Sequence, residues 1–101
     1  MLLKQDFDRI FSQVDVILAP TCPSTALPIG RSLNHPMFGE IADVLIEGSS
    51  LTGHTGVNVP VGQIAGLPVG MQLIANHFCE QTILNLAYAY EQSTNWKENK
   101  L

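Results

Sequence analysis

Residues 52–74 carry the clearest pattern of apolar and polar positions in the chain. Two short apolar runs, 55–61 and 67–74, flank the small polar segment 63–66. Runs of this kind, separated by about four residues that include glycine, predict a β-hairpin or a strand–turn–strand corner. Proline cannot donate a ladder hydrogen bond, so Pro60 and Pro68 are expected at strand ends or on a sheet edge. In the same runs Gly56 and Gly70 suggest a bulge, or a place where other backbone or a ligand comes close.

Helical periodicity marks three further segments. The apolar residues of 2–13 recur at i, i+4, i+7 and i+8, which predicts an amphipathic helix without a capping residue, as if cut from a longer chain. A second helix is expected over 80–92, with Cys79 where Asp, Ser or Thr usually caps. A shorter helix is expected over 41–47, weakened nearby by Gly48.

The remaining segments predict one strand, one loop and a tail. Residues 16–19 form a continuous apolar run, which fits a strand buried on both faces, as in parallel sheets. The proline-rich segment 20–36 is predicted to be an ordered, extended loop. Residues 93–101 are polar and are expected to fray, with Trp96 docking back onto the body.

Low charge changes the picture of a self-sufficient domain. Charged residues make up 14% of the 101 residues, whereas soluble domains average about 25%. A small domain has a large surface for its volume and should carry more charge than average. We therefore expect part of the surface to be covered by the rest of a longer polypeptide or by a partner, and the isolated chain to self-associate. An unusually apolar but self-sufficient domain is the alternative.

Several classes of function are disfavoured by charge and cysteine content. The net charge is −4 with only five Lys and Arg, so direct nucleic-acid binding is not expected. No apolar run approaches the ~20 residues of a membrane span, and Lys4 and Asp6 interrupt any secretory signal. Cys22 and Cys79 stand far apart, which indicates free thiols in a reducing, cytoplasmic setting without a disulfide or zinc site.

Candidate chemistry within the chain is sparse. Ser49 or Ser50 with His54 could form a nucleophile–base pair, but the flanks lack a G-x-S-x-G elbow, so polar residues closing a helix are the favoured interpretation. His35 and His77 stand alone in predicted loops and are interpreted as surface hydrogen-bonding residues. No phosphate-binding glycine pattern is present, and neither a metal site nor a cofactor is expected.

Two positions remain as ligand-site candidates. Thr21 and Cys22 follow the predicted strand 16–19, and loops leaving the carboxyl end of such strands hold ligands in α/β proteins. A loop that merely ties down the surface is an equally weighted alternative. Asp43 falls within the expected helix 41–47, and on the residues alone a carboxylate facing water is favoured over one that meets a ligand.

The order of motifs along the chain resembles the carboxyl-terminal portion of amidase-signature enzymes. The segments are VDVILAPTCP, a proline-rich loop with PIG, ADVL, GVNVPVG, GLPVGMQLIANHF and AYAYEQSTNW. The resemblance implies an α/β fold in which residues 1–101 are an incomplete part of one amidase domain. That part would be a fragment of an α/β/α sandwich with a mixed sheet, with about three strands and three helices.

The resemblance also implies roles for individual residues. Family members use a Ser nucleophile, a second Ser in a cis peptide and a Lys base from a Gly/Ser-rich segment, and no Gly-Gly-Ser-Ser-Gly-Gly stretch occurs here. No catalytic residue is therefore expected in this chain, which should be inactive alone. By position, Asp43 matches the Asp that holds the substrate's amino group in glutamine-using members. Thr21 would line the same cleft.

Within the family, the chain is most similar to members that release ammonia from glutamine as part of an amidotransferase complex. The implied partners are the remainder of the amidase domain, the other amidotransferase subunits, and glutamine or another amide as substrate. Residues 46–53 depart from the usual Val-Pro-Ala-Asn-Leu-Ala-Gly, which keeps a different amidase as an alternative. The other alternative is a small interaction protein that uses an exposed sheet edge to dock a partner.

Overall fold

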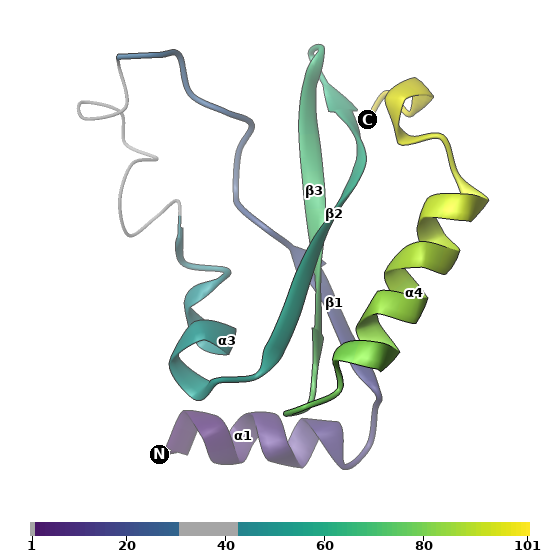
Figure 1. Ribbon diagram of the computed structural model, residues 1–101. Helices are drawn as coiled ribbons and strands as arrows, with labels where there is room; N and C mark the ends of the chain where they lie inside the picture. Colours follow the sequence, from purple (N-terminus) through teal and green to yellow (C-terminus); the bar gives the residue numbers. More distant parts are fainter. Residues whose placement is uncertain (1, 31–42) are drawn as a thin grey trace.

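The computed structural model describes residues 2–30 and 43–101. Its strands are β1 (Val16–Pro20), β2 (Thr55–Ile64) and β3 (Leu67–Ala75), and its helices are α1 (Leu2–Phe11), α3 (Glu47–Thr52) and α4 (Glu80–Ser93), followed by the 3₁₀ turn η2 (Trp96–Glu98). The strands form one sheet in the order β1-β3-β2, with β3 at its centre. In Figure 1 the sheet stands between α3 and α4, with α1 across its lower end. Within residues 2–30 and 43–101 the expected three strands and three helices are present.

The hairpin is longer and its turn tighter than the sequence predicts. β2 and β3 pair in antiparallel register from Thr55 opposite Ala75 to Ile64 opposite Leu67. Only Ala65 and Gly66 connect them, with φ of 52° and 80°. Two residues with positive φ are typical of the tight hairpin turns that match strand twist, and glycine adopts this conformation without a steric penalty. The polar segment 63–66 is thus half strand and half turn.

β1 is the clearest correction to the expected sheet. It pairs antiparallel to β3, from Val16 opposite Ala75 to Pro20 opposite Met71. Leu18 is 65% exposed, so β1 is not buried on both faces within the described part of the chain. An apolar run reports low polarity but not the direction of the neighbouring strand, which is why the inference of a parallel strand was wrong.

The helix expected over 41–47 is interrupted: Asp43 is helical, and a turn separates it from α3. Residues 41 and 42 lie outside the described residues, 44–46 form a turn, and α3 begins at Glu47. Gly53 ends α3 with φ 75° and donates its N–H to Ser49 O, a common glycine C-cap. Gly48 lies inside the helix because the Phe7 ring takes up the space, 3.2 Å from where a Cβ would lie.

The end of the chain is bonded to the sheet edge, where we expected residues 93–101 to fray. β2 is bulged between Pro60 and Gly62, so the Val61 carbonyl faces outward and accepts a bond from Asn99 Nδ2 at 3.2 Å. Backbone bonds of 2.8 Å also join Gln63 N to Asn99 O and Leu101 N to Gln63 O. A bulge leaves ladder groups without a strand partner, and here the tail supplies one.

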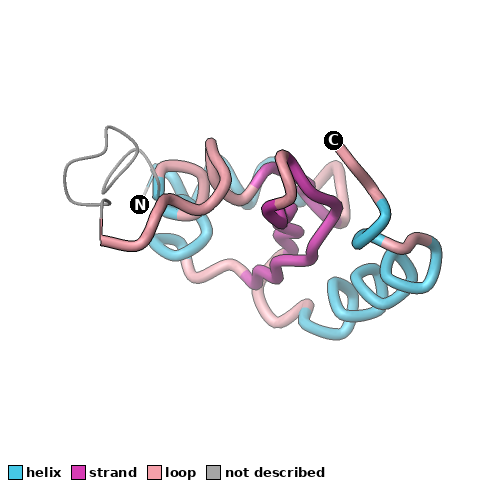
Figure 2. The backbone as a smooth tube through the Cα atoms, turned by 90° about the horizontal axis from the view of Figure 1, so that it is seen from above, coloured by secondary structure: helices cyan, strands magenta, loops and turns pink. Residues whose placement is uncertain are grey.

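The buried core is small for a chain of this length. Its apolar members come from the hairpin and α4, namely Val59, Leu73, Ile74, Ala75 and Ile83. α4 packs against β2 and β3, and Figure 2 shows the sheet between α4 and the segments on its other side. Large apolar side chains remain exposed on several elements, including Leu2, Leu18, Leu51, Leu84 and Tyr88. Contiguous exposed apolar surface usually marks contacts, which agrees with the low charge.

Candidate functional site

Thr21 is held at the end of β1 by a side chain from the far strand of the sheet. Its hydroxyl donates a hydrogen bond to Asn58 Oδ1, so β1 and β2 are bridged across β3. Gly70 of β3 leaves the necessary room, because a Cβ there would lie only 2.6 Å from Asn58 Oδ1. The sequence predicted a bulge or an approach of backbone or ligand at Gly70, whereas the close neighbour is the Asn58 side chain. At Gly56 the nearest atom to an added Cβ is 3.8 Å away, an ordinary contact.

Gln72 joins the two backbone segments that carry the candidate residues. It is 6% exposed, and its Nε2 donates to Pro20 O at 3.0 Å and to Leu45 O at 2.6 Å. Pro20 directly precedes Thr21, and Leu45 follows Asp43 by two residues. One amide group of the central strand thus uses both of its N–H donors to position both segments.

Thr21 lines a polar hollow of about 310 Å³. Its wall is formed by the loop after β1, by α3 and the turn before it, by the first half of β2, and by one residue of β3. The lining residues are Thr21, Ile46, Ser49, Ser50, His54, Gly56, Val57, Asn58 and Gln72. Hydroxyl and amide groups dominate the polar part, so this hollow suits a neutral, hydrogen-bonding ligand such as a carboxamide.

Asp43 lies at a second hollow, of about 480 Å³, lined with Ile46, Glu47, Ser50 and Leu51. Ile46 and Ser50 also line the hollow of Thr21, so the two hollows adjoin. The structure therefore brings the two predicted site residues to neighbouring surfaces and not into one shared cavity. The Asp43 side chain is exposed, which leaves its carboxylate available to a cationic group.

The serines of α3 do not form a nucleophile–base pair with His54. Ser49 Oγ and Ser50 Oγ both donate to Ile46 O, at 3.3 and 3.2 Å. The two ring nitrogens of His54 instead contact Thr52 Oγ1 at 2.6 Å and Asp8 Oδ1 at 3.3 Å. The favoured interpretation of residues 47–54, polar groups closing a helix, agrees with this geometry.

His77 is not the lone surface residue that its position in the sequence suggests. Its ring lies 4.0 Å from the ring of His54, measured between centroids, and Asp8 lies beside them. Burial lowers the pKa of His54, and the neighbouring His77 lowers this pKa further. The hydrogen bond from Lys4 lowers the pKa of Asp8. The Asp8–His54–His77 cluster is the set of described residues that could ligate a metal ion; His35 lies outside the described residues.

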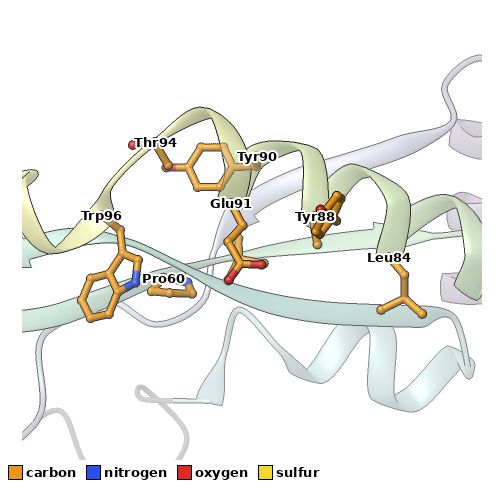
Figure 3. Close-up of a pocket in the computed structure, with 9 residues that line it drawn as sticks. Pro60, Leu84, Tyr88, Tyr90, Glu91, Thr94 and Trp96 are labelled. Carbon is orange, nitrogen blue, oxygen red and sulfur yellow. The ribbon is translucent and has the colours of Figure 1, made fainter.

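A more apolar groove lies between α4 and β2, with a volume of about 310 Å³. Figure 3 shows Trp96 beside Pro60 at one end of this groove and Leu84 at the other. The expected docking of Trp96 is thus confirmed, and Tyr88 and Tyr90 serve as groove walls. Thr21 and Asp43 do not line this groove, so we place the candidate site at the polar hollows.

The family model described as amidase matches residues 1–84. The chain belongs to the amidase family. A glutamyl-tRNA(Gln) amidotransferase subunit from a Geobacillus species is 42% identical over 99 residues, covering 98% of this chain and 20% of that protein. Its counterpart from Clostridium acetobutylicum is 40% identical over 97 residues, covering 96% of this chain and 20% of that protein. This amidase-family chain therefore spans about a fifth of the length of these relatives.

A solved amidase-family structure shares the fold. The crystal structure of the corresponding glutamyl-tRNA(Gln) amidotransferase subunit from Thermotoga maritima matches with a TM-score of 0.85 and 32% identity. The match covers 95% of this chain and 21% of that one. The α/β architecture expected from the resemblance is confirmed. No helix in the described ranges is long and apolar enough to cross a membrane.

Gln72 and Asn58 are the positioning residues that sequence reasoning did not single out. Gln72 belongs to the GLPVG-x-Q-L-I motif, where a polar residue at a buried strand position was the available signal. A buried amide must find partners, so its presence in an apolar run indicates a structural task. Asn58 stands among β-branched neighbours and gave a similar but weaker signal.

Proposed function

We propose that this chain forms one wall of the substrate cleft in an amidase-family amide hydrolase whose substrate is glutamine. The whole enzyme would be the glutaminase subunit of a glutamyl-tRNA(Gln) amidotransferase. Its ammonia would convert misacylated Glu-tRNA(Gln) to Gln-tRNA(Gln). The support is the similarity to relatives that carry this name, together with the two polar hollows described above.

The chemical step would be performed by residues outside this chain. A Ser nucleophile attacks the side-chain amide carbon, backbone N–H groups stabilise the oxyanion, and ammonia leaves as the acyl-enzyme forms. Water then releases glutamate. The predicted contribution of this chain is to hold the substrate, which fits a segment with neutral hydrogen-bonding groups in one hollow and an exposed carboxylate in the next.

The observation that carries the proposal is the placement of Asp43. Its exposed carboxylate lies one hollow away from Thr21, and Gln72 holds both backbone segments. Glutamine carries an α-ammonium group several bonds from its amide, so a carboxylate in the adjoining hollow could pair with the ammonium while the hollow of Thr21 receives the amide. A carboxylate beside an ammonium gives a strong charge-assisted hydrogen bond.

The test measures kcat/KM of the intact enzyme after Asp43→Asn. Loss of one hydrogen bond to a charged group costs about 1.5–3 kcal/mol, so kcat/KM for glutamine should fall roughly 10- to 150-fold. An analogue of glutamine that lacks the α-amino group should be hydrolysed equally by the parent and the variant. Glu47→Gln is the matched control, because Glu47 lines the same hollow.

An unchanged kcat/KM for glutamine would remove Asp43 from the site. An equal loss with the analogue would assign Asp43 a structural role instead. A different amidase is the competing function, because residues 46–53 depart from the usual family segment and line both hollows. A parent enzyme that hydrolyses another carboxamide with a higher kcat/KM than glutamine would favour it.

A further inference from the structure

Three side chains with metal-ligating atoms converge where three elements meet. Asp8 comes from α1, His54 lies between α3 and β2, and His77 lies just before α4. One ligand atom of each lies within 4.8 Å of those of the other two. These residues are separated by 46 and 23 positions along the chain, so their meeting is a product of the fold.

The hydrogen bonds of Thr52 determine which nitrogen of His54 carries its proton. A hydroxyl has a single hydrogen, and Thr52 donates it to Gly48 O at 2.9 Å, since a carbonyl can only accept. The 2.6 Å contact with His54 Nδ1 is then a bond in which Nδ1–H donates to Thr52 Oγ1. His54 Nε2 is left with its lone pair, and His⁺ is disfavoured because the side chain is 0% exposed.

That lone pair points at another acceptor. His54 Nε2 lies 3.3 Å from Asp8 Oδ1, and a carboxylate oxygen has no hydrogen to donate. The second oxygen of Asp8 is already bonded to Lys4 Nζ at 2.9 Å, which leaves Oδ1 facing the imidazole. Two acceptors facing each other repel unless a cation lies between them.

His77 brings a second imidazole ring to the same place. Its Nε2 is buried and has no hydrogen-bond partner among the described residues. Buried polar atoms are nearly always satisfied, and one that is not calls for a physical explanation such as a bound ion. One bound cation would satisfy His77 Nε2 and remove the repulsion between Asp8 and His54.

We propose that Asp8, His54 and His77 form a binding site for a divalent ion of the zinc class. Metal–nitrogen and metal–oxygen distances of about 2.0–2.2 Å place tetrahedral ligand atoms about 3.3–3.6 Å apart. The 3.3 Å between His54 Nε2 and Asp8 Oδ1 already meets this spacing. Closing the widest pair from 4.8 Å needs a side-chain movement of about 1.5 Å at most.

The surroundings support such a site. The rings of Phe7 and Phe11 lie 5.2 and 5.3 Å from the His54 ring and exclude water on that side. Thr52 acts as an outer-shell partner, since metal-bound histidines usually donate their other N–H to an oxygen. Asp8 is 42% exposed, which gives the ion an entry path and room for a bound water. Bound metal would join α1 to the hairpin and to α4.

The experiment titrates the complete protein with Co²⁺, followed by the d–d absorption of tetrahedral cobalt, and then displaces the cobalt with Zn²⁺. We expect the parent protein to bind one Co²⁺ ion in this site. Each of the variants Asp8→Asn, His54→Gln and His77→Gln should lose this binding. Thr52→Val should weaken Zn²⁺ binding about 10- to 100-fold, as outer-shell changes typically do. Lys4→Met should tighten binding, because Lys4 competes for Asp8. The matched control is Asp6→Asn, an exposed carboxylate on the same helix that pairs with Arg9 at 3.5 Å.

Three results would overturn the proposal. The first is no tetrahedral cobalt spectrum in the parent protein. The second is a spectrum that persists in His77→Gln or in Asp8→Asn, and the third is equal weakening by Asp6→Asn. Far-ultraviolet circular dichroism of every variant confirms that the fold is retained. Asp8 and His77 are partly exposed, so Asp8→Asn and His77→Gln keep the test decisive if His54→Gln fails to fold.

Discussion

Gly62→Ala tests whether the end of the chain is an integral part of the sheet. Gly62 follows the bulge in β2 and has Asn99 directly against it. An added Cβ would lie 2.7 Å from Asn99 O and 3.1 Å from both Asn99 Cβ and Leu101 Cγ. The closest of these atoms is backbone, so a side-chain rotation cannot relieve the clash. Residues 99–101 would have to move away from the edge of β2.

The cost of that movement follows from the bonds that break. Three hydrogen bonds hold the tail to β2, from Gln63 N to Asn99 O, from Leu101 N to Gln63 O and from Asn99 Nδ2 to Val61 O. Each contributes about 0.5–1.5 kcal/mol net, which gives about 1.5–4.5 kcal/mol together. Replacing glycine by alanine also lowers the conformational entropy of the unfolded chain, which stabilises the folded state by about 0.4–1 kcal/mol. We expect Gly62→Ala to lower the free energy of unfolding by about 0.5–4 kcal/mol.

The assay is urea unfolding followed by circular dichroism, with Gly56→Ala as the matched control. Gly56 lies in the same strand, and its added Cβ would meet nothing closer than 3.8 Å. Gly56→Ala should be neutral or slightly stabilising. In a chain that ends before Asn99, Gly62→Ala should no longer lower the free energy of unfolding. Equal stabilities of the two alanine variants in the complete chain would refute the docked tail.

Two further substitutions test the helix start and the buried amide. Cys79→Asp should raise the free energy of unfolding by about 0.5–2 kcal/mol, because Cys79 occupies the N-cap of α4 without a side-chain cap bond; a lower thermal midpoint than Cys79→Ala would contradict this. Gln72→Met should cost about 1–3 kcal/mol in urea unfolding, because two carbonyls lose their donor. Gln72→Glu should be no better than Gln72→Met, since a carboxylate cannot donate; recovery of stability in Gln72→Glu would show that shape alone matters.

Local sequence patterns predicted the helices and the hairpin, because these elements are determined by residues close together in the sequence. The period of apolar residues identified α1 and α4, and the glycine–proline punctuation located the hairpin. The carboxyl end of α3 was missed because Gly48 was taken as a weak point, whereas Gly53 was the informative glycine. It ends α3 in the left-handed conformation that glycine adopts most readily.

Contacts between residues far apart in the sequence could not be predicted from these local patterns. The strand 16–19 was recognised, yet its antiparallel pairing with β3 joins residues more than 50 positions apart. The partners of Gln72 lie 27 and 52 positions away, and Asp8, which contacts His54, is similarly remote. Thr21 became a candidate because it follows the strand 16–19, and the family resemblance gave Asp43 its role. Their placement at adjoining hollows became visible only in three dimensions.

Because β3 is the central strand, amide hydrogens in different parts of the candidate site should exchange with solvent at different rates. From Met71 to Ala75 this strand is paired on both sides, whereas Leu67 to Gly70 are paired with β2 alone. Amide hydrogens of the doubly paired stretch should exchange with solvent last, since they open only with the core. Gln72 lies in that stretch, while Thr21 and Asp43 lie in segments outside the sheet. Gln72 can therefore remain in the paired strand while the segments of Thr21 and Asp43 adjust around an incoming molecule.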